Sequence, residues 1–447
     1  MQYLSTRDSA LRVSAQEAIV RGLAPQSGLF VPETFPQADL DAWKNLSYPE
    51  LAEKVLAGFL TDYSADFLHT ATASTYGAAF GGKAGETVKV RDGLYSLELW
   101  HGPTCAFKDY ALQLMPKLLV EAKKMLGRTE TTRILVATSG DTGKAALAGY
   151  ADLDGIEIEV FYPNDGTSEI QHLQMATQKG ENVQVYAVQG NFDDAQTGVK
   201  KVFADADVAA ELEKRGIRLS SANSINWGRL VPQIVYYFAA YAQLLKAGKI
   251  TFGDKVDFCV PTGNFGDILA GYYAKQMGLP VGKLVCASNQ NNVLTDFLST
   301  GTYTAKREFY KTTSPSMDIL VSSNLERLLY HVTGSDAEVA GLMKSLNETG
   351  RYTVRPETLK AIQESFDCGW SSEEQVAGEI RARYEKDGYL CDTHTAVAFH
   401  VAAQKKRDGV PMVVLSTASP FKFPRSVLEA LGHTAPENDF EAMQALE

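Results

Sequence analysis

One lysine of this chain has neighbours that suit covalent chemistry. Lys108 stands in the run LWHGPTCAFKDY, from Leu99 to Tyr110, among residues that are mostly apolar or small. Burial there would favour the neutral amine and lower a pKa that is about 10.4 in a free peptide. A neutral amine can condense with an aldehyde, so Lys108 could hold an aldehyde cofactor as a Schiff base. A buried ion pair with the following aspartate is the alternative for an isolated Phe-Lys-Asp sequence.

Two later segments could hold the rest of such a cofactor. The turn PTGNFGD, from Pro261 to Asp267, follows the apolar run VDFCV and leads into a helical pattern. A helix that begins there would present unpaired N–H groups and a positive dipole end to a phosphate. The GxxG spacing does not satisfy the dinucleotide fingerprint GxGxxG. The second segment is the polar run STASPFKFP, from Ser416 to Pro424, which follows the last apolar run, MVVLST.

A third turn, TSGDTGKAAL, directly follows the apolar run RILVA. Its small residues let the backbone approach an anion at the start of a helix. A tight turn capped by Asp141 or Thr142 is the alternative interpretation. The pair Gly143 and Lys144 looks like the end of a Walker A loop, but Thr138 stands at its first glycine and Ala145 at its metal-binding hydroxyl.

A fourth polar segment, SSANSINWGRLVPQ from Ser220, collects amide, hydroxyl and guanidinium groups just before an apolar helix. Taken alone, it is typical of a capped helix start. Facing a phosphorylated substrate, it would be a second anion site, with Arg229 and Lys422 as candidate cations.

The segments HGPTCAFKDY, ATSGDTG, SANSIN, PTGNFGD and STASPFKF occur in this order and at separations that resemble the threonine synthases. These are pyridoxal-phosphate enzymes of the tryptophan-synthase-β fold type, fold type II, and the resemblance covers nearly the whole chain. It implies that Lys108 holds the cofactor and that Thr417 lies at the pyridine nitrogen. The residues that it assigns to the cofactor phosphate are Gly263, Asn264, Phe265, Gly266 and Asp267. Of these, Asp267 is expected to cap the helix, because a carboxylate aimed at the phosphate would repel it.

The resemblance also implies a substrate and a reaction. The enzyme would convert O-phospho-L-homoserine and water to L-threonine and phosphate by a β,γ-replacement, the last step of threonine biosynthesis. The turn after RILVA would grip the α-carboxylate, and the fourth segment would bind the substrate phosphate. The substrate-binding residues expected on this basis are Ser139, Gly140, Asp141, Thr142, Gly143, Ser224, Asn226, Arg229 and Lys422. The chain departs from the family pattern TAHPAKF, with Ser419 at the histidine and Phe421 at the second alanine.

Two other activities remain open from the residues. A related lyase would release the same substrate as 2-oxobutyrate, and one sequence does not identify the residues that exclude this. A nucleotide-dependent transferase built on the Lys144 turn is the alternative from a different class, which the broken Walker pattern disfavours.

Short apolar runs alternate with amphipathic stretches after residue 88, which indicates parallel sheets covered by helices. The sequence predicts an α/β protein with two parallel-sheet lobes, helices on both faces around a cofactor cleft, and a helical amino-terminal lobe. Its expected parts are residues 1–85, the catalytic region 86–430 with a smaller lobe at about 130–215, and a tail at 431–447. The expected strands begin at Arg133, Ile156, Asn182, Val256, Lys283 and Met412.

Composition bounds the location and the partners. The chain has 447 residues and a net charge of −11, which argues against nucleic acid or an anionic membrane as a partner. The five scattered cysteines show no metal spacing, and none of His101, His172, His394 and His400 has a partner at ligand spacing, so no metal site is expected. No secretory signal is visible, which predicts a cytoplasmic enzyme. We expect a monomer or a homodimer.

Overall fold

The computed structural model describes residues 1–138, 140–164, 169–190 and 192–447. Its largest sheet has six strands in the order β14-β11-β10-β15-β5-β4. Only the pair of β4 and β5 is antiparallel. The strands are β4 (Glu86–Arg91), β5 (Leu94–Glu98), β10 (Val256–Pro261), β11 (Val281–Ser288), β14 (Phe366–Trp370) and β15 (Met412–Ser416).

The central strands of this sheet are buried on both faces, as their near-continuous apolar sequences require. Phe258 and Val413 pack on one face with helices α12 (Ile234–Lys246) and α13 (Gly266–Gln276). Cys259 and Val414 pack on the other face with α19 (Thr393–Lys405). Successive residues of each strand thus supply two separate cores.

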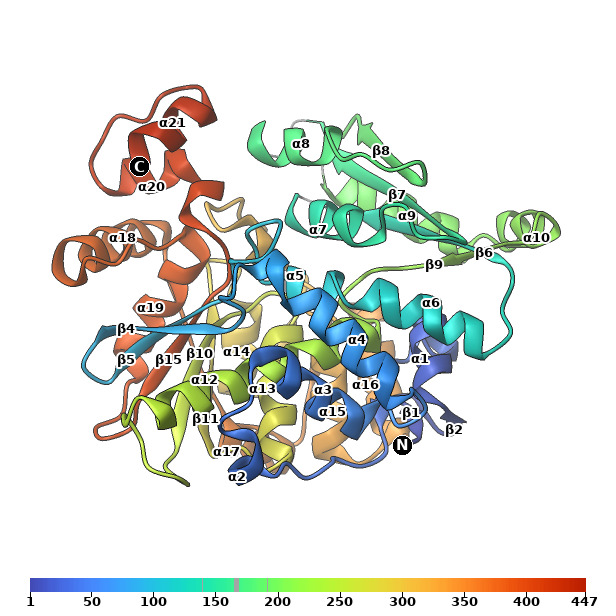
Figure 1. Ribbon diagram of the computed structural model, residues 1–447, viewed down its shortest axis with the longest axis horizontal. Helices are drawn as coiled ribbons and strands as arrows, with labels where there is room; N and C mark the ends of the chain where they lie inside the picture. Colours follow the sequence, from blue (N-terminus) through green and yellow to red (C-terminus); the bar gives the residue numbers. More distant parts are fainter. Residues whose placement is uncertain (139, 165–168, 191) are drawn as a thin grey trace.

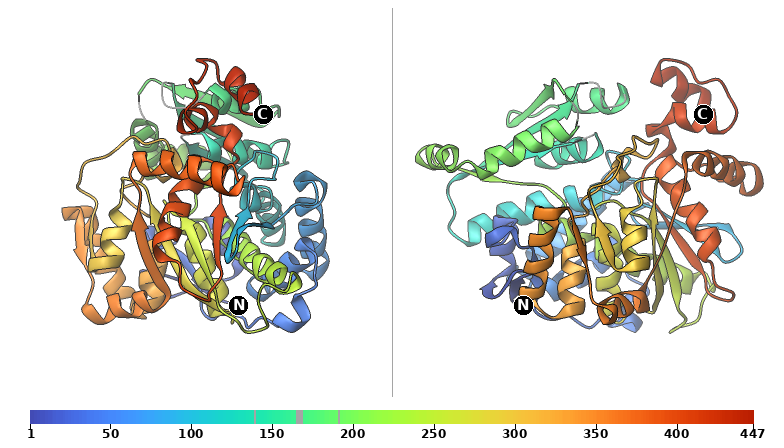
Figure 2. Two further views of the ribbon diagram at one scale, coloured as in Figure 1. Left: turned by 90° about the vertical axis from the view of Figure 1, so that its left-hand side faces the viewer. Right: turned by 180° about the vertical axis from the view of Figure 1, so that it is seen from behind.

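The second sheet has four parallel strands in the order β8-β7-β6-β9. Its elements are β6 (Thr131–Ala137), β7 (Ile156–Pro163), β8 (Val183–Val188), β9 (Ile217–Ser220), α7 (Asp141–Tyr150), α8 (Glu169–Ala176), α9 (Phe192–Ala204) and α10 (Ala206–Lys214). This lobe lies above the body that holds the six-stranded sheet (Figure 1), and the view from behind shows the same arrangement (Figure 2). The expected α/β class with two parallel sheets and helices on both faces is confirmed.

The amino-terminal segment is helical, as expected, and it also contains strands that the sequence did not predict. It contains a three-stranded antiparallel sheet of β1 (Tyr3–Ser5), β2 (Asp8–Val13) and β3 (Phe30–Pro32). These strands are short, and β2 alternates exposed and half-buried residues, so no apolar run marks them in the sequence. The helices of this segment are α1 (Ala15–Arg21), α2 (Leu40–Trp43), α3 (Tyr48–Phe59) and α4 (Ala65–Tyr76).

The remaining elements surround the larger sheet. The helices are α5 (Asp109–Leu112), α6 (Met115–Met125), α11 (Trp227–Leu230), α14 (Val293–Thr300), α15 (Leu325–Thr333), α16 (Asp336–Thr349), α17 (Pro356–Ser365), α18 (Glu373–Asp387), α20 (Pro424–Ala430) and α21 (Asp439–Leu446). A two-stranded sheet joins β12 (Thr302–Thr304) to β13 (Arg351–Thr353). Short 3₁₀ turns occur at Pro25–Ser27, Ala78–Phe80, Val231–Gln233, Pro315–Met317 and Pro420–Lys422. In the part of the chain that the structure describes, no helix is long and apolar enough to cross a membrane.

Candidate active site

A cavity of about 1050 Å³ lies where the carboxyl ends of strands from both sheets meet. Parallel α/β sheets place binding sites at this edge, because the loops after the strands converge there. The expected site residues that line the cavity are Lys108, Thr142, Ser224, Arg229, Gly263, Asn264, Gly266, Asp267 and Thr417. Six other expected residues do not line the cavity: Gly140, Asp141, Gly143, Asn226, Phe265 and Lys422. Ser139 lies outside the described residues.

Lys108 is held against the end of β15. The Phe107 amide donates to the Thr417 carbonyl at 2.8 Å, and Ala106 and Ala418 form an isolated antiparallel bridge. Burial lowers the pKa of Lys108 to about 8, although the nearby Asp141 carboxylate opposes this shift. With this pKa, roughly a tenth of the Lys108 amine is in the neutral, nucleophilic form at pH 7.

Asp109, the residue after the lysine, has other partners. Its carboxylate accepts hydrogen bonds from the Thr104 amide and hydroxyl, both at 2.8 Å, and from the Gln113 side chain at 3.1 Å. Within the described residues, no ion pair joins it to Lys108. The buried Lys-Asp pair that the sequence left open is thus absent, and Lys108 faces the cavity.

The turn at residues 261–267 forms a tight backbone cradle. A Cβ atom added to Gly263 would lie 2.9 Å from the Ser316 carbonyl oxygen, so only glycine fits there. Phe265 has a left-handed backbone with φ 63°, and α13 begins at the next residue. The Ser322 hydroxyl donates to the Gly263 carbonyl at 2.7 Å, which fixes the turn from behind. This close backbone approach at the start of an eleven-residue helix suits a phosphate group.

Asp267 does not cap α13 as expected. The cap position belongs to Phe265, and Asp267 is the second residue of the helix. Its carboxylate accepts a hydrogen bond from the Ile268 amide at 2.9 Å. The helix thus begins two residues earlier than the sequence predicts, because the left-handed residue that ends the turn is not a glycine. Burial raises the pKa of Asp267 to about 7, so this carboxyl is readily protonated.

The turn between β6 and α7 is held by the Thr138 side chain, and the cap position of α7 belongs to Gly140, not to Asp141 or Thr142. The Thr138 hydroxyl accepts hydrogen bonds from the Gly140 amide at 2.9 Å and from the Gly143 amide at 3.0 Å. Gly140 has φ 144°, and a Cβ there would lie 2.4 Å from the Gln171 side chain. The turn is thus compact, with Thr142 on the cavity wall.

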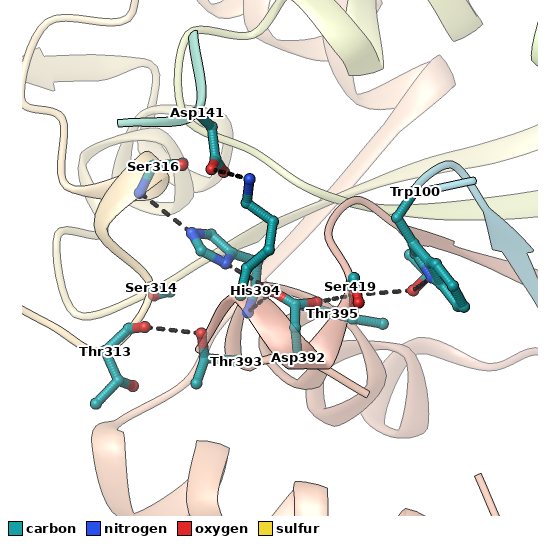
Figure 3. Close-up of polar contacts among 12 residues, drawn as sticks. Trp100, Asp141, Thr313, Ser314, Ser316, Asp392, Thr393, His394, Thr395 and Ser419 are labelled. Carbon is teal, nitrogen blue, oxygen red and sulfur yellow. Dashed lines mark hydrogen bonds and ion pairs between the residues drawn. The ribbon is translucent and has the colours of Figure 1, made fainter. Parts of the chain in front are cut away.

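Asp141 and Lys422 form a buried ion pair with N–O distance 2.9 Å, drawn in Figure 3. Burial alone would raise the pKa of Asp141, but the Lys422 and Lys108 ammonium groups hold it well below its usual range. The Lys422 ammonium also donates to the Thr104 carbonyl at 2.9 Å. The Asp141 and Lys422 charges therefore neutralise each other in the protein interior, next to the cavity.

Arg229 is the buried cation on the wall of the cavity near the fourth polar segment. Its Nη1 donates to the Ala222 carbonyl at 2.5 Å, while its buried Nε has no hydrogen-bond partner among the described residues. Burial lowers its pKa to about 10, which leaves it charged at neutral pH. Asn226 caps α11 by accepting from the Gly228 amide at 2.9 Å, as the alternative interpretation of this segment predicts. An anion in the cavity would meet Arg229 beside Ser224.

His394 also lines the cavity, although the sequence reasoning considered it only as a metal ligand. Its Nδ1 lies 2.7 Å from Asp392, and its Nε2 accepts from the Ser316 amide at 3.1 Å (Figure 3). The sequence signal was an aspartate two residues before the histidine at the start of a helical pattern. The pairing with Ser316 joins residues 78 positions apart, which no local pattern reveals.

One group of possible metal ligands occurs in the described part of the chain. Glu86, Glu98 and His101 place ligand atoms within 4.8 Å of one another. The His101 Nε2 atom lies 2.8 Å from Glu98 and 3.3 Å from Glu86, which a hydrogen-bonded histidine explains. The absence of a metal site stays a prediction.

Comparisons with known proteins match the whole length of the chain. Residues 2–76 match the family model "Threonine synthase N terminus", residues 84–417 match "Pyridoxal-phosphate dependent enzyme", and residues 395–447 match "Threonine synthase, C-terminal". The chain is 41% identical to threonine synthase of Pseudomonas aeruginosa, with 96% of this chain and 90% of that protein aligned.

A human relative and a solved structure extend the similarity. The human protein "Threonine synthase-like 1" is 40% identical over 96% of this chain, which spans only 60% of the length of that relative. The crystal structure of pyridoxal-phosphate-bound threonine synthase from Brucella melitensis superposes with a TM-score of 0.91 at 39% identity, covering 99% of this chain and 94% of that one.

Proposed function

Because the chain belongs to the threonine synthase family of pyridoxal-phosphate-dependent enzymes, we propose that it converts O-phospho-L-homoserine and water to L-threonine and phosphate. In this reaction the Cγ–O bond to phosphate breaks, Cγ gains a hydrogen, and water adds a hydroxyl group at Cβ while Cβ loses a hydrogen. The observation that carries the proposal is Lys108, whose amine lies on the cavity wall with a pKa lowered by burial.

The residues around the cavity fit pyridoxal phosphate. The Lys108 amine would hold the aldehyde, the glycine cradle at 263–266 would hold the phosphate, and Thr417 would face the pyridine nitrogen. When bound, the cofactor supplies an electrophilic carbon and a conjugated ring that stabilises negative charge. A neutral hydroxyl at position 417 would accept or donate one hydrogen bond without forcing a charge on the ring nitrogen.

Lys108 has a second role in this proposal. When it is not bonded to the cofactor, the Lys108 amine would be free to accept the proton from the substrate Cα. An amine whose pKa is about 8 is well matched to proton transfer near neutral pH. Such positioned proton transfer typically contributes about 10² to 10⁴ in rate.

The two anionic groups of the substrate would be held by different walls. We propose that Thr142 and the turn between β6 and α7 receive the carboxylate, and that Ser224 and Arg229 receive the phosphate. The buried Nε of Arg229 would then gain the partner that it lacks. For Lys422, the ion pair with Asp141 supports a different role, in which it fixes the turn that carries Thr142.

The experiment is proton NMR of the protein supplied with pyridoxal phosphate and O-phospho-L-homoserine, which follows organic product and free phosphate together. We expect threonine and phosphate in equal amounts. Lys108→Ala should bind the cofactor weakly and lose turnover, and near-wild-type activity of this variant would refute the assigned role of the lysine.

Two alternative functions predict other results. Release of phosphate with 2-oxobutyrate would identify a lyase that uses the same cavity. Binding of ATP by a colourless protein would favour the nucleotide-dependent transferase. The structure gives this last alternative little support, because the Lys144 ammonium donates to the Gln178 side chain at 2.6 Å and Lys144 does not line the cavity.

A cytoplasmic location and a monomeric or homodimeric state complete the proposal. The substrate is a small molecule in the proposed reaction, and the net charge of −11 disfavours nucleic acid as a further partner. Size-exclusion chromatography with light scattering would determine the assembly state.

A further inference from the structure

The amino end of α19 is a buried polar cluster that the proposed reaction does not use. Four consecutive side chains here are polar, and one of them is charged, yet each is at most 3% exposed: Asp392, Thr393, His394 and Thr395. Asp392 caps the helix by accepting from the amides of Thr395 and His394, both at 3.0 Å. Four polar side chains buried beside the cavity wall need a structural or functional reason.

Both ring nitrogens of His394 are used by the protein itself. The Nε2 atom accepts from the Ser316 amide at 3.1 Å, so it carries a lone pair. The proton of the neutral ring is therefore on Nδ1, which donates to Asp392 at 2.7 Å. With both nitrogens bonded to protein groups, His394 is suited to hold the chain in place and not to exchange protons with a substrate.

The first segment that this cluster holds is the cavity wall at residues 313–316. Besides the Ser316 amide, the Thr313 carbonyl accepts from the Thr393 hydroxyl at 2.7 Å (Figure 3). The Ser316 carbonyl in turn packs against the backbone of Gly263, with no room for a side chain between them. The start of α19 therefore supports the cradle proposed for the cofactor phosphate.

The second segment is the end of β15. The Thr395 hydroxyl bonds the Asp392 carboxylate and lies 3.2 Å from the Ser416 hydroxyl. Ser416 also accepts from the Trp100 indole at 3.1 Å, and the next residue is Thr417 on the cavity wall. One carboxylate thus connects to both ends of the proposed cofactor position.

We infer that Asp392 and His394 are a positioning pair, which sets the distance between the 263–267 turn and Thr417 and thereby the affinity for pyridoxal phosphate. This inference rests on the proposed function, because it takes its two anchor points from the cofactor site proposed there. The pair touches neither end directly and acts through Ser316 and Ser416.

Two substitutions at one position separate the two bonds of the imidazole. In His394→Asn the amide nitrogen takes the place of Nδ1, so the bond to Asp392 is kept and the bond to Ser316 is lost. In His394→Gln the carbonyl oxygen takes the place of Nε2, so the acceptor for Ser316 is kept. A buried amide without a partner is costly, and we expect His394→Asn to raise the pyridoxal phosphate dissociation constant about tenfold. His394→Gln loses the bond to Asp392 but keeps the bond to Ser316, so we expect a smaller increase, of about threefold. This graded response is one that a merely space-filling role would not give.

The dissociation constants would be measured by titration of the cofactor-free protein with pyridoxal phosphate. Hydrogen exchange of the peptide that contains residues 312–318 gives a second readout, and it should accelerate in His394→Asn alone. His331→Asn is the matched control, because His331 bonds the Tyr273 hydroxyl at 2.7 Å and does not line the cavity. Its cofactor affinity should equal that of the wild type.

The inference is overturned if His394→Asn binds the cofactor like the wild type, or if Gln and Asn weaken binding equally. Should His394→Asn fail to fold, Asp392→Asn keeps the shape of the helix cap and removes the charge that binds His394 and Thr395, and a wild-type affinity there would overturn the inference as well. A wild-type protein that binds pyridoxal phosphate but makes no threonine would refute the proposed reaction, while the affinity comparison still decides this inference.

Discussion

At the scale of single residues, Lys108 is a place where the protein gives up stability for reactivity. Burial lowers its pKa from the ordinary value of 10.5 to about 8. One pKa unit corresponds to about 1.4 kcal/mol, so protonated Lys108 destabilises the folded cofactor-free protein by about 3 kcal/mol. The same burial favours the neutral amine, which is the form that reacts with an aldehyde.

Replacing this lysine should therefore stabilise the cofactor-free protein. We expect Lys108→Met to raise the free energy of unfolding by about 2–3 kcal/mol at pH 7. Between pH 8 and 10.5 the unfolded lysine still binds a proton that the folded one has released, so the wild type gains stability there and the difference shrinks. Urea unfolding at pH 7 and at pH 9.5 measures both effects, and an equal difference at the two pH values would contradict this account.

Asp267 should make the affinity for the cofactor phosphate depend on pH. Its pKa is raised to about 7 by burial, and a phosphate dianion beside it would raise the pKa further. Binding of the phosphate then requires uptake of a proton, so the affinity should fall as pH rises above about 7. We expect Asp267→Asn to keep the affinity at pH 7 within about threefold and to lose this pH dependence. Both proteins would be compared in a Lys108→Met background, by titration with pyridoxine phosphate, so that neither the lysine charge nor the aldehyde contributes. A parallel pH dependence in both would refute the assigned effect.

At the scale of elements, the close approach of α7 to α5 positions the lysine. A Cβ atom on Gly149 of α7 would lie 1.9 Å from the Leu112 carbonyl oxygen of α5, the short helix that directly follows Lys108. A contact with backbone is not relieved by a change of side-chain rotamer. The glycine therefore allows the smaller lobe to pack against the segment that carries the reactive amine.

A methyl group at this contact should separate the two helices. We expect Gly149→Ala to lower the free energy of unfolding by about 1–3 kcal/mol and to reduce threonine formation. Gly341→Ala is the matched control, because a Cβ on this exposed glycine of α16 meets open space. The control should gain up to about 1 kcal/mol from the better helix propensity of alanine. Thermal unfolding of both variants tests the pair, and similar changes in the two would contradict the close-contact argument.

The elements also differ in how well the sequence predicts them. The six expected strands are confirmed, because each contains several apolar residues. Strands β10, β11 and β15 are buried on both faces, whereas β8 alternates half-buried and exposed residues. In contrast, β9 has only four residues, and β14 (FDCGW) has only five and includes an aspartate and a glycine, so neither stands out. Within the site, Lys108 and the 263–267 turn are marked by local sequence. The role of His394 was missed because it depends on Ser316, which only folding brings close.

At the scale of the whole molecule, an ion pair between half-buried Arg7 and buried Glu326 joins the amino-terminal segment to α15. The Arg7 guanidinium donates to both carboxylate oxygens of Glu326 at 2.8 Å, and the Thr6 hydroxyl donates to the same carboxylate at 2.6 Å. Residues 319 positions apart in the sequence are thus held together next to the cavity. The amino-terminal strands are therefore part of the main body.

Removing one partner of this pair should destabilise the protein. We expect Arg7→Met to lower the free energy of unfolding by about 3 kcal/mol, because the buried Glu326 charge loses its compensation. Adding Glu326→Gln to this variant removes the buried charge and should recover part of the loss. Urea unfolding of the two variants tests this expectation, and a double variant less stable than Arg7→Met would contradict it.

The strand order of the large sheet has a consequence for synthesis on the ribosome. Strand β15, at residues 412–416, lies between β10 and β5 near the middle of the sheet. Strands β10 and β5 emerge from the exit tunnel long before β15 does. Until then their facing edges have no hydrogen-bonding partner, because only the last tenth of the chain supplies it. The four strands of the smaller sheet lie between residues 131 and 220 and can pair much earlier. Nascent chains should therefore depend on chaperones until translation is almost complete.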